Sequence, residues 1–382
     1  MEQVTICEMR TYMNSTLDFY KGKKVLITGH TGFKGSWLTA ILVEAGAEVT
    51  GYSLEPPTDP SLFAEAGLEK NINHIIGDVR DRDKIMKVFQ EIRPEIVFHL
   101  AAQPLVRESY KNPVLTYETN VMGTVNICEA VRLTDSVKSF LNVTTDKVYK
   151  NEELNKGFKE DDPLDGYDPY SNSKSCSELV THSYINSFFN EMGIAVSTAR
   201  AGNVIGGGDF AKDRIIPDCV RAAEKKYTGE STEDIIVRNP YSIRPYQHVL
   251  EPLNIYLTIA KAQYEDKKYA GYYNVGPNDE DCVTTGDLVD IFCKCWNEAV
   301  DQEASDTENK RKISWINRSD NGPHEAGFLK LDCDRIKQVF GWKPVWNIDM
   351  AIQKVVEFSK RRIEEPDMVA DEMKKEINEF FG

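Results

Sequence analysis

The sequence lacks the features that would place the protein in a membrane, in an oxidising compartment or on nucleic acid. No run of about 18 apolar residues occurs, so we expect no helix that spans a bilayer. The opening MEQVTICEMRTYMNST has neither the basic start nor the apolar stretch of a signal peptide. The eight cysteines include no CxxC and the six histidines no paired spacing, which argues against a metal site and favours reduced thiols in the cytoplasm.

Basic residues are also fewer than acidic ones, because the chain has 46 Lys and Arg but 61 Asp and Glu, which gives a net charge of −15. This balance excludes a general DNA or RNA binder, which needs cations to replace phosphate counterions. It argues equally against docking on an anionic membrane. A small phosphorylated ligand stays possible, since it needs only a local cluster of donors.

Short apolar stretches alternate with helical ones up to about residue 202 of the 382 residues. The expected strands are 24–28, 48–53, 72–76, 96–100, 140–144 and 195–201. The expected helices between them are 36–45, 82–92, 114–133 and 171–189. This alternation predicts an α/β fold with a Rossmann-type, doubly wound parallel sheet that carries helices on both faces.

A glycine-rich turn, GHTGFKG, joins the first expected strand to the first expected helix. Glycines let the backbone approach a pyrophosphate, and the helix N-terminus supplies free N–H groups. The strand before it and the helix after it are the context that such a motif requires. The GxxGxxG spacing resembles that of the short-chain dehydrogenase/reductase superfamily. It predicts dinucleotide binding by Gly29, Thr31, Gly32, Phe33 and Gly35.

The cofactor is expected to be NAD rather than NADP. No Lys or Arg occurs between Ser36 and Glu69, where a ribose 2′-phosphate would need a partner, and Lys34 is the one nearby cation that weakens this argument. Further cofactor contacts are expected at the carboxyl ends of the next strands. They are Ser53, Asp78, Val79, Leu100, Ala101, Ala102, Gln103 and Thr144.

The catalytic pair is expected in YSNSK, where Tyr170 and Lys174 stand one helical turn apart. A phenol has a pKa near ~10, and an adjacent ammonium stabilises its phenolate, so that the pair can accept a proton from a hydroxyl. YxxxK occurs twice more, at Tyr20 and Tyr264. Only the Tyr170 copy follows the fifth strand, so its position selects it, and the other two are interpreted as surface pairs.

The triplet Thr145-Asp146-Lys147 ends that fifth strand. A simple alcohol dehydrogenase needs only one hydroxyl at this place, whereas an added acid and amine imply further proton transfers. Asp146 could protonate a leaving hydroxyl, and a neutral Lys147 could remove a proton beside a carbonyl. An ordinary charged surface turn is the alternative.

Beyond residue 202 the chain becomes richer in Gly, Pro, Asn and Arg, which predicts a second, smaller lobe. We expect an N-terminal extension at 1–18, a dinucleotide-binding domain at 19–202 and a C-terminal α/β substrate lobe at 203–360, partly interleaved with the first domain. We also expect a charged helix at 361–382, which packs on the surface, and a mobile charged loop at 298–312.

Several longer phrases make the chain similar to extended short-chain dehydrogenases that act on nucleotide sugars, and more narrowly to the CDP-glucose 4,6-dehydratases. The resemblance runs from about Asp18 to Phe358. The phrases are GHTGFKGSWL (29–38), HLAAQPLVRESY (99–110), TTDKVY (144–149), YSNSK (170–174), RAGNVIGGGDF (200–210) and RPYQHV (244–249).

The resemblance implies NAD-dependent conversion of CDP-glucose to CDP-4-keto-6-deoxyglucose. Tyr170 would deprotonate the 4-hydroxyl, Thr145 would bind its oxygen and Lys174 the nicotinamide ribose. Lys147 would take the C5 proton, and Asp146 would protonate the departing C6 hydroxyl. Related dTDP-glucose dehydratases carry Glu at the position of Lys147. The resemblance also implies a homodimer or homotetramer.

The nucleotide sugar is expected to bind through arginines and polar residues outside the glycine turn. These candidates are Arg107, Asn203, Arg214, Arg238, Arg244, His324 and Glu325. Another nucleotide-sugar dehydratase or a 4-epimerase is the alternative function, and the Asp146-Lys147 pair counts against the epimerase. A non-catalytic NAD-sensing protein is the remote alternative, since such proteins often lose the Tyr/Lys pair.

Overall fold

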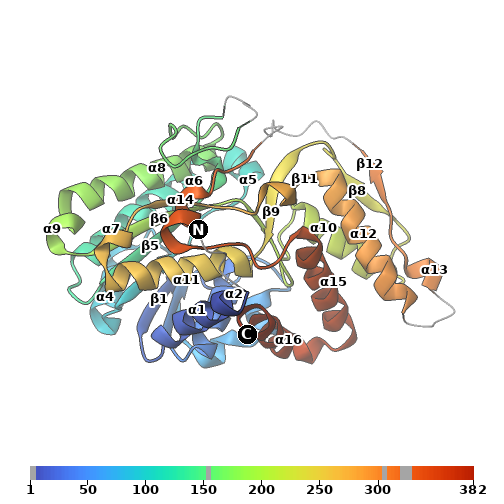
Figure 1. Ribbon diagram of the computed structural model, residues 1–382, viewed down its shortest axis with the longest axis horizontal. Helices are drawn as coiled ribbons and strands as arrows, with labels where there is room; N and C mark the ends of the chain where they lie inside the picture. Colours follow the sequence, from blue (N-terminus) through green and yellow to red (C-terminus); the bar gives the residue numbers. More distant parts are fainter. Residues whose placement is uncertain (1–5, 152–155, 303–307, 319–328) are drawn as a thin grey trace.

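A computed structural model describes residues 6–151, 156–302, 308–318 and 329–382, and within these ranges it describes the side chains of all residues except 6–12, 308 and 309. Its main feature is a seven-stranded parallel sheet in the order β10-β6-β5-β4-β1-β2-β3 (Figure 1). The strands are β1 (Lys24–Thr28), β2 (Glu48–Ser53), β3 (Asn73–Ile76), β4 (Ile96–His99), β5 (Ser139–Thr145), β6 (Ala195–Ala201) and β10 (Tyr272–Val275). The predicted α/β doubly wound fold is confirmed.

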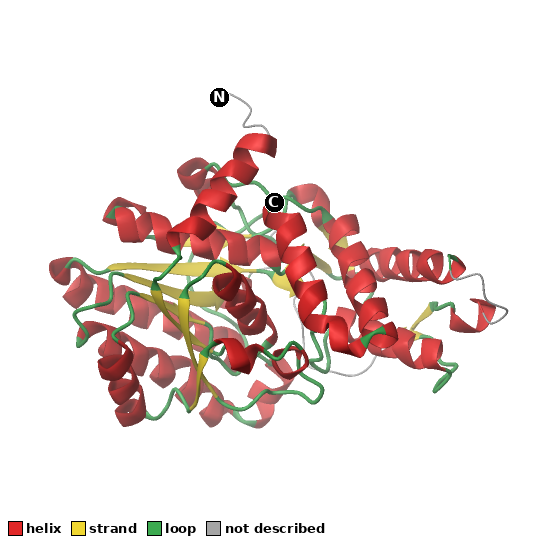
Figure 2. Cartoon of the chain, turned by 90° about the horizontal axis from the view of Figure 1, so that it is seen from below, coloured by secondary structure: helices red, strands yellow, loops and turns green. Residues whose placement is uncertain are grey.

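Helices cover both faces of this sheet, as Figure 2 shows. Side chains alternate along a strand, so Val25 and Ile27 pack with one helical layer while Leu26 packs with the other. The first layer contains α2 (Phe33–Glu44), α11 (Leu250–Glu265) and α1 (Ile6–Phe19). The second contains α4 (Arg82–Ile92), α7 (Gly123–Arg132) and α8 (Pro169–Tyr184). Because helices cover both faces, β1, β4 and β5 are buried along nearly their whole length.

Short helical segments connect these elements. They are α3 (Leu62–Glu65), η1 (Leu68–Asn71), α5 (Val106–Lys111), α6 (Pro113–Tyr117), the π-helical turn η2 (Glu118–Met122), η3 (Asp146–Val148), the π-helical turn η4 (Ile185–Phe189), α9 (Asn190–Met192) and η5 (Lys267–Tyr269).

Most of the remaining elements form a second region with its own core, to which Phe292, Trp296 and Ile352 belong. Its strands are β7 (Asn203–Ile205), β8 (Ile235–Val237), β9 (Ile243–His248), β11 (Cys282–Thr284) and β12 (Trp315–Asn317), paired as β11-β9-β7 and β12-β8. Its helices are α10 (Ile215–Thr228), η6 (Asp279–Asp281), α12 (Thr285–Asp301), α13 (Glu308–Arg311) and α15 (Ile348–Glu364). Helices α14 (Asp334–Phe340) and α16 (Val369–Phe381) pack with the first core, and η7 (Pro366–Met368) joins α15 to α16.

The six predicted strands agree with the structure to within one residue at either end. The sheet is completed from beyond residue 202, because β10 pairs with β6 and α11 packs on β5 and β6. No helix within the described ranges is both long and apolar enough to cross a membrane.

The predicted N-terminal extension is corrected by the structure, because residues 6–19 form helix α1 against α11. Met13 and Thr16 are buried there. In the predicted charged loop, α12 continues to Asp301 and residues 308–311 are helical, while 303–307 lie outside the described residues.

The predicted tail helix at 361–382 is also corrected. Residues 361–364 end α15, and the separate helix α16 begins at Val369. One face of α16 is apolar and buried against α2 and α15, so this helix belongs to the core rather than to a solvated surface. The buried residues are Val369, Met373, Ile377, Phe380 and Phe381.

Candidate active site

A cavity of about 1190 Å³ lies at the carboxyl ends of the sheet strands, between the sheet and the second region. This is where doubly wound folds bind ligands. The cavity collects most of the predicted site residues. From the cofactor and catalytic predictions it is lined by Gly29, Thr31, Gly32, Phe33, Gly35, Ser53, Asp78, Val79, Leu100, Ala101, Ala102, Thr144, Thr145, Lys147, Tyr170 and Lys174. From the substrate predictions it is lined by Arg107, Asn203, Arg214, Arg238 and Arg244.

Four predicted residues are not in that lining. Asp146 lies fully buried behind it. Gln103 shapes the turn after β4, because its amide donates to Thr116 and its oxygen accepts from the backbone N–H of Leu105 at 2.6 Å. His324 and Glu325 lie outside the described residues.

The glycine turn has the close packing that a dinucleotide requires. Gly29 has φ +78°, and a Cβ there would lie 2.7 Å from the backbone nitrogen of Ala101. A Cβ on Gly35 would lie 2.1 Å from the carbonyl oxygen of Gly29. Gly32 caps α2 without a side-chain hydrogen bond, so the first N–H groups of that helix are left for a ligand. The turn therefore fits a pyrophosphate at the helix N-terminus.

Lys34 points away from the expected adenosine ribose position at Ser53. Its Nζ lies 3.5 Å from the Tyr256 hydroxyl on α11. Burial, with the nearby charges of Arg214 and Lys174, lowers the pKa of Lys34 to about 7. Ser53 instead shares a 2.9 Å hydrogen bond with Thr31. Lys34 thus lies at the catalytic end of the cavity and not at the expected adenosine ribose position, where it would have favoured NADP.

Helix α8 holds Tyr170 and Lys174 in its first two turns. Asp168 caps the helix by accepting from the Ser171 N–H at 3.0 Å. The Lys174 ammonium donates to the Val143 carbonyl at 2.9 Å. Burial lowers the pKa of Lys174 to about 8, against an opposing effect of Glu178.

The Tyr170 phenol lies beside the end of β5. Burial raises the pKa of Tyr170 to about 12, although its hydrogen bond with Thr145 and the charge of Arg214 work against the rise. A cationic nicotinamide in the cavity would lower it further, since an opposite charge favours the phenolate. The structure thus brings together the phenol, the ammonium and a hydroxyl as the sequence predicted.

The acid and the amine of the triplet form a pair at the start of η3. Asp146 Oδ1 accepts from the Thr145 hydroxyl at 2.9 Å and from Lys147 Nζ at 3.1 Å. Lys147 Nζ also donates to Asn203 Oδ1 at 3.3 Å. Asp146 Oδ2 is buried and accepts no hydrogen bond from the described residues. A buried, partly unsatisfied carboxylate excludes the ordinary surface turn.

Two of the three predicted arginines of the second region, Arg214 and Arg238, are paired with acids. Arg214 lies 3.3 Å from Asp209, and Arg238 lies 3.1 Å from Asp213. Arg244 donates to the Ile243 carbonyl at 2.9 Å. A guanidinium carries five N–H bonds in a planar fork, which is a geometry that suits a diphosphate.

Sequence reasoning missed two buried charged residues next to the catalytic pair, Glu178 on α8 and Arg200 on β6. Their carboxylate and guanidinium lie 2.9 Å apart. The available signals were an acid one turn after Lys174 on the same helical face and an arginine within the apolar strand AVSTARA.

Comparisons with known proteins agree with this geometry. A model of the GDP-mannose 4,6 dehydratase family matches residues 26–355. The CDP-glucose 4,6-dehydratase of Salmonella typhimurium is 46% identical over 371 residues, which cover 96% of this chain and 98% of that protein.

Solved structures share the fold at lower identity. The dTDP-glucose 4,6-dehydratase of Bacillus anthracis in complex with NAD has a TM-score of 0.70 and 18% identity, covering 90% of this chain and 98% of that one. The UDP-glucose 4-epimerase of Thermotoga maritima with UDP-glucose has a TM-score of 0.68 and 20% identity, and the match covers 89% of this chain and 99% of that one. The family match spans the whole cavity, and the chain belongs to the GDP-mannose 4,6-dehydratase family of nucleotide-sugar-modifying short-chain dehydrogenases.

Proposed function

We propose that the protein is an NAD-dependent CDP-glucose 4,6-dehydratase that converts CDP-glucose to CDP-4-keto-6-deoxyglucose. The observation that carries this proposal is the Asp146–Lys147 pair, 3.1 Å apart, beside Thr145 and Tyr170 at one end of the cavity. Oxidation of an alcohol does not need this pair, whereas loss of water needs both a base and an acid. The 46% identity to the Salmonella enzyme supports the choice of substrate.

Bound NAD would accept a hydride from C4 of the glucose and return it to C6. Tyr170 takes the proton of the 4-hydroxyl, and the Thr145 hydroxyl holds the resulting oxygen in place. Lys174 stabilises the phenolate and binds the nicotinamide ribose. The glycine turn and the N-terminus of α2 bind the pyrophosphate.

The elimination uses the acid and the amine as a unit. Transfer of one proton from the Lys147 ammonium to Asp146, across 3.1 Å, gives a neutral amine and a carboxylic acid. The amine then takes the C5 proton, which the C4 carbonyl has made acidic, and Asp146 gives its proton to the C6 hydroxyl. Water leaves, and the pair returns to ammonium and carboxylate. When the hydride returns to C6, the Lys147 ammonium gives a proton to C5. The proton that Tyr170 took from the 4-hydroxyl then restores the Lys147 ammonium, so that protons balance within the site.

The substrate lobe at 203–360 is proposed to bind the nucleotide part of the substrate. Arg214, Arg238 and Arg244 line the same cavity as the triplet and supply cations to the diphosphate. Arg107 and Asn203 are proposed to contact the sugar and its phosphate. His324 and Glu325 stay predictions.

Product formation across CDP-, dTDP-, UDP- and GDP-glucose tests the proposal. We expect a 4-keto-6-deoxy product from CDP-glucose at a rate well above that with the other three. A 4-epimer as product would instead establish the alternative, which the fold alone does not separate because epimerases share it. Conversion of none of the four would contradict the proposed function.

We also propose a homodimer in the cytoplasm. Apolar side chains stay exposed on α6, η2 and α8, among them Val114 at 70% and Leu179 at 53% exposure. These three helical segments contact one another, and exposed apolar side chains gathered on one face support an interface there. The seven cysteines with described side chains are all free, as in a reducing compartment. Light scattering of the purified chain tests the dimer, and a monomer would contradict it.

A further inference from the structure

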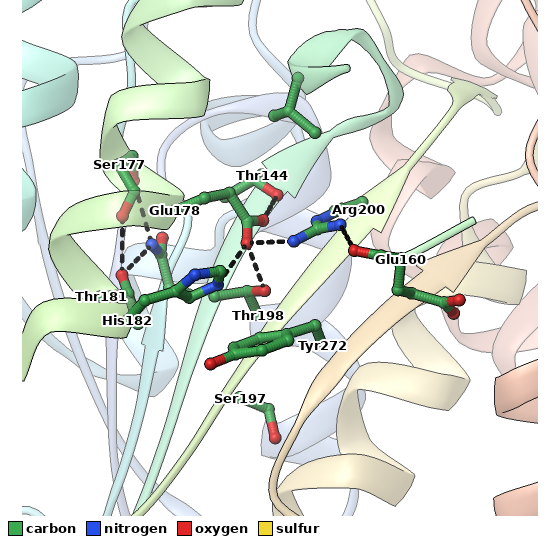
Figure 3. A network of polar contacts seen from close by, with 12 residues as sticks. Thr144, Glu160, Ser177, Glu178, Thr181, His182, Ser197, Thr198, Arg200 and Tyr272 are labelled. Carbon is green, nitrogen blue, oxygen red and sulfur yellow. Dashed lines mark hydrogen bonds and ion pairs between the residues drawn. The ribbon is translucent and has the colours of Figure 1, made fainter. Parts of the chain in front are cut away.

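Glu178 is a buried carboxylate on α8, one helical turn beyond Lys174 and outside the cavity. It is the centre of the polar network drawn in Figure 3. Its partner Arg200, on β6, is buried as well, and the two groups lie 2.9 Å apart. Burying two charges costs several kcal/mol of desolvation, and apolar residues of similar size often serve stability as well or better. The position therefore calls for a role besides stability.

The contacts of Glu178 join α8, which carries Tyr170 and Lys174, to β5, which ends at Thr145, and to β6. Thr144, at the end of β5, donates to one carboxylate oxygen. Thr198, on β6, donates to the other at 2.7 Å. Arg200 extends the network by donating to the Tyr149 hydroxyl and to the Glu160 carbonyl, each at 2.8 Å.

These anchor points lie next to the reacting groups along the chain. Thr144 immediately precedes Thr145, and Arg200 stands three residues before Asn203, which holds Lys147 at 3.3 Å. One carboxylate thus ties the helix of Tyr170 and Lys174 to the end of β5, which precedes the elimination pair, and to β6, which leads to Asn203.

The network also sets the electrostatic environment of Lys174. Burial disfavours its ammonium, and the charge of Glu178 favours it. Burial also opposes ionisation of Glu178, but Arg200, His182 and Thr144 outweigh it and lower the pKa of Glu178 to about 2. Titratable or charged groups face this pair from all the neighbouring elements. They are Lys34 on α2, His99 on β4, Tyr170 and His182 on α8, Arg200 on β6, Tyr272 on β10, and Asp146, Tyr149 and Glu160 after β5.

We propose that Glu178 is a positioning residue of the dehydratase reaction, which keeps Lys174 charged beside Tyr170 and aligns the ends of β5 and β6 with α8. Arg200 is the counter-charge that makes this possible, because it leaves the buried pair neutral. The inference rests on the proposed function and adds to it a requirement for a carboxylate outside the cavity.

The pH dependence of kcat/KM for CDP-glucose in three variants tests this role. In Glu178→Gln the charge of Arg200 is uncompensated and repels the Lys174 ammonium. We expect the alkaline fall of kcat/KM to begin at least one pH unit below that of the wild type, which makes it about tenfold lower than wild type near pH 8. In Arg200→Gln, kcat/KM should begin to fall at a pH no lower than in the wild type. The double variant Glu178→Gln with Arg200→Gln lacks both charges, so the pH at which kcat/KM begins to fall should return toward the wild-type value.

A purely structural role predicts a different pattern. It would lower kcat/KM by one factor at every pH, and the double variant would be worse than either single variant; that result would overturn the proposal. Glu224→Gln is the matched control, because Glu224 pairs with Arg362 at 3.1 Å in the second region. In Glu224→Gln, kcat/KM should begin to fall at the same alkaline pH as in the wild type.

A second readout does not depend on the substrate. Competitive labelling of Lys174 with a small amine reagent, quantified by mass spectrometry against pH, follows the titration of this amine in the same proteins. An unshifted titration in every folded variant would overturn the inference even if CDP-glucose is converted. Failure of the wild type to convert CDP-glucose, with the expected shifts in labelling, would contradict the proposed function alone.

Discussion

Replacement of Lys147 by alanine should separate the two halves of the reaction. The amine lies 3.1 Å from Asp146 and 3.3 Å from Asn203, while its side chain keeps 28% exposure toward the cavity. Tyr170, Thr145 and Lys174 are untouched by this change, so oxidation at C4 should continue. Removal of a general base costs about 10²–10⁴ in rate, or roughly 3–5 kcal/mol of barrier, and this loss should fall on elimination alone.

Rapid mixing of NAD-loaded enzyme with CDP-glucose measures both halves at once. The absorbance of the reduced cofactor should rise in Lys147→Ala and persist, while the final product forms about 10²–10⁴ times more slowly than in the wild type. Lys268→Ala is the control, since Lys268 belongs to another YxxxK and pairs on the surface with Asp266 at 2.8 Å. Normal product formation by Lys147→Ala would remove this residue from the mechanism. Absence of reduced cofactor would show that Lys147 acts before elimination.

Three further predictions concern binding and stability. In Gly35→Ala the new Cβ would lie 2.1 Å from the Gly29 carbonyl oxygen, so the turn must shift and NAD affinity measured by calorimetry should fall at least tenfold; unchanged affinity would contradict the role of the turn. Glu178→Gln should lower the free energy of unfolding by about 3–5 kcal/mol at pH 7, because an unpaired Arg200 stays buried. The pKa of Glu178 is lowered to about 2 despite its burial, so its carboxylate stabilises the fold fully above about pH 4.5 and progressively less toward pH 2. Denaturant curves of the wild type and Glu178→Gln should therefore converge in acid. Deletion of 369–382 removes five buried apolar side chains, worth about 1.5–3 kcal/mol each, and should leave no soluble folded protein in a circular dichroism and sedimentation assay; a folded truncated enzyme would show that α16 is dispensable.

Local sequence patterns were enough to find the sheet and the chemistry. Apolar runs such as KVLIT and AVSTARA give strands because both faces of a parallel sheet are buried. Tyr170 was selected from three YxxxK copies by its place after β5, and the structure puts it in the cavity. The Tyr20 copy illustrates why the pattern alone fails, since its hydroxyl is buried and donates to the Leu257 carbonyl at 2.7 Å rather than lying on the surface.

What escaped prediction depends on contacts between distant parts of the chain. The partner of β6 is β10, which lies about 70 residues further on, and no local signal names it. The acids that pair with Arg214 and Arg238 are recognisable only once the loops are folded. Helix α16 looked like a charged tail, because its apolar residues recur at helical spacing among many acids and lysines.

Loss of water from CDP-glucose at this site requires removal of the C5 proton and its later replacement from the solvent-exchanged Lys147 amine. Incubation with CDP-glucose in deuterated water, followed by mass spectrometry and NMR of the product, tests this requirement. We expect a 4-keto-6-deoxy sugar that carries one solvent deuterium at C5. A product that keeps its 6-hydroxyl and has no deuterium at C5 would contradict it.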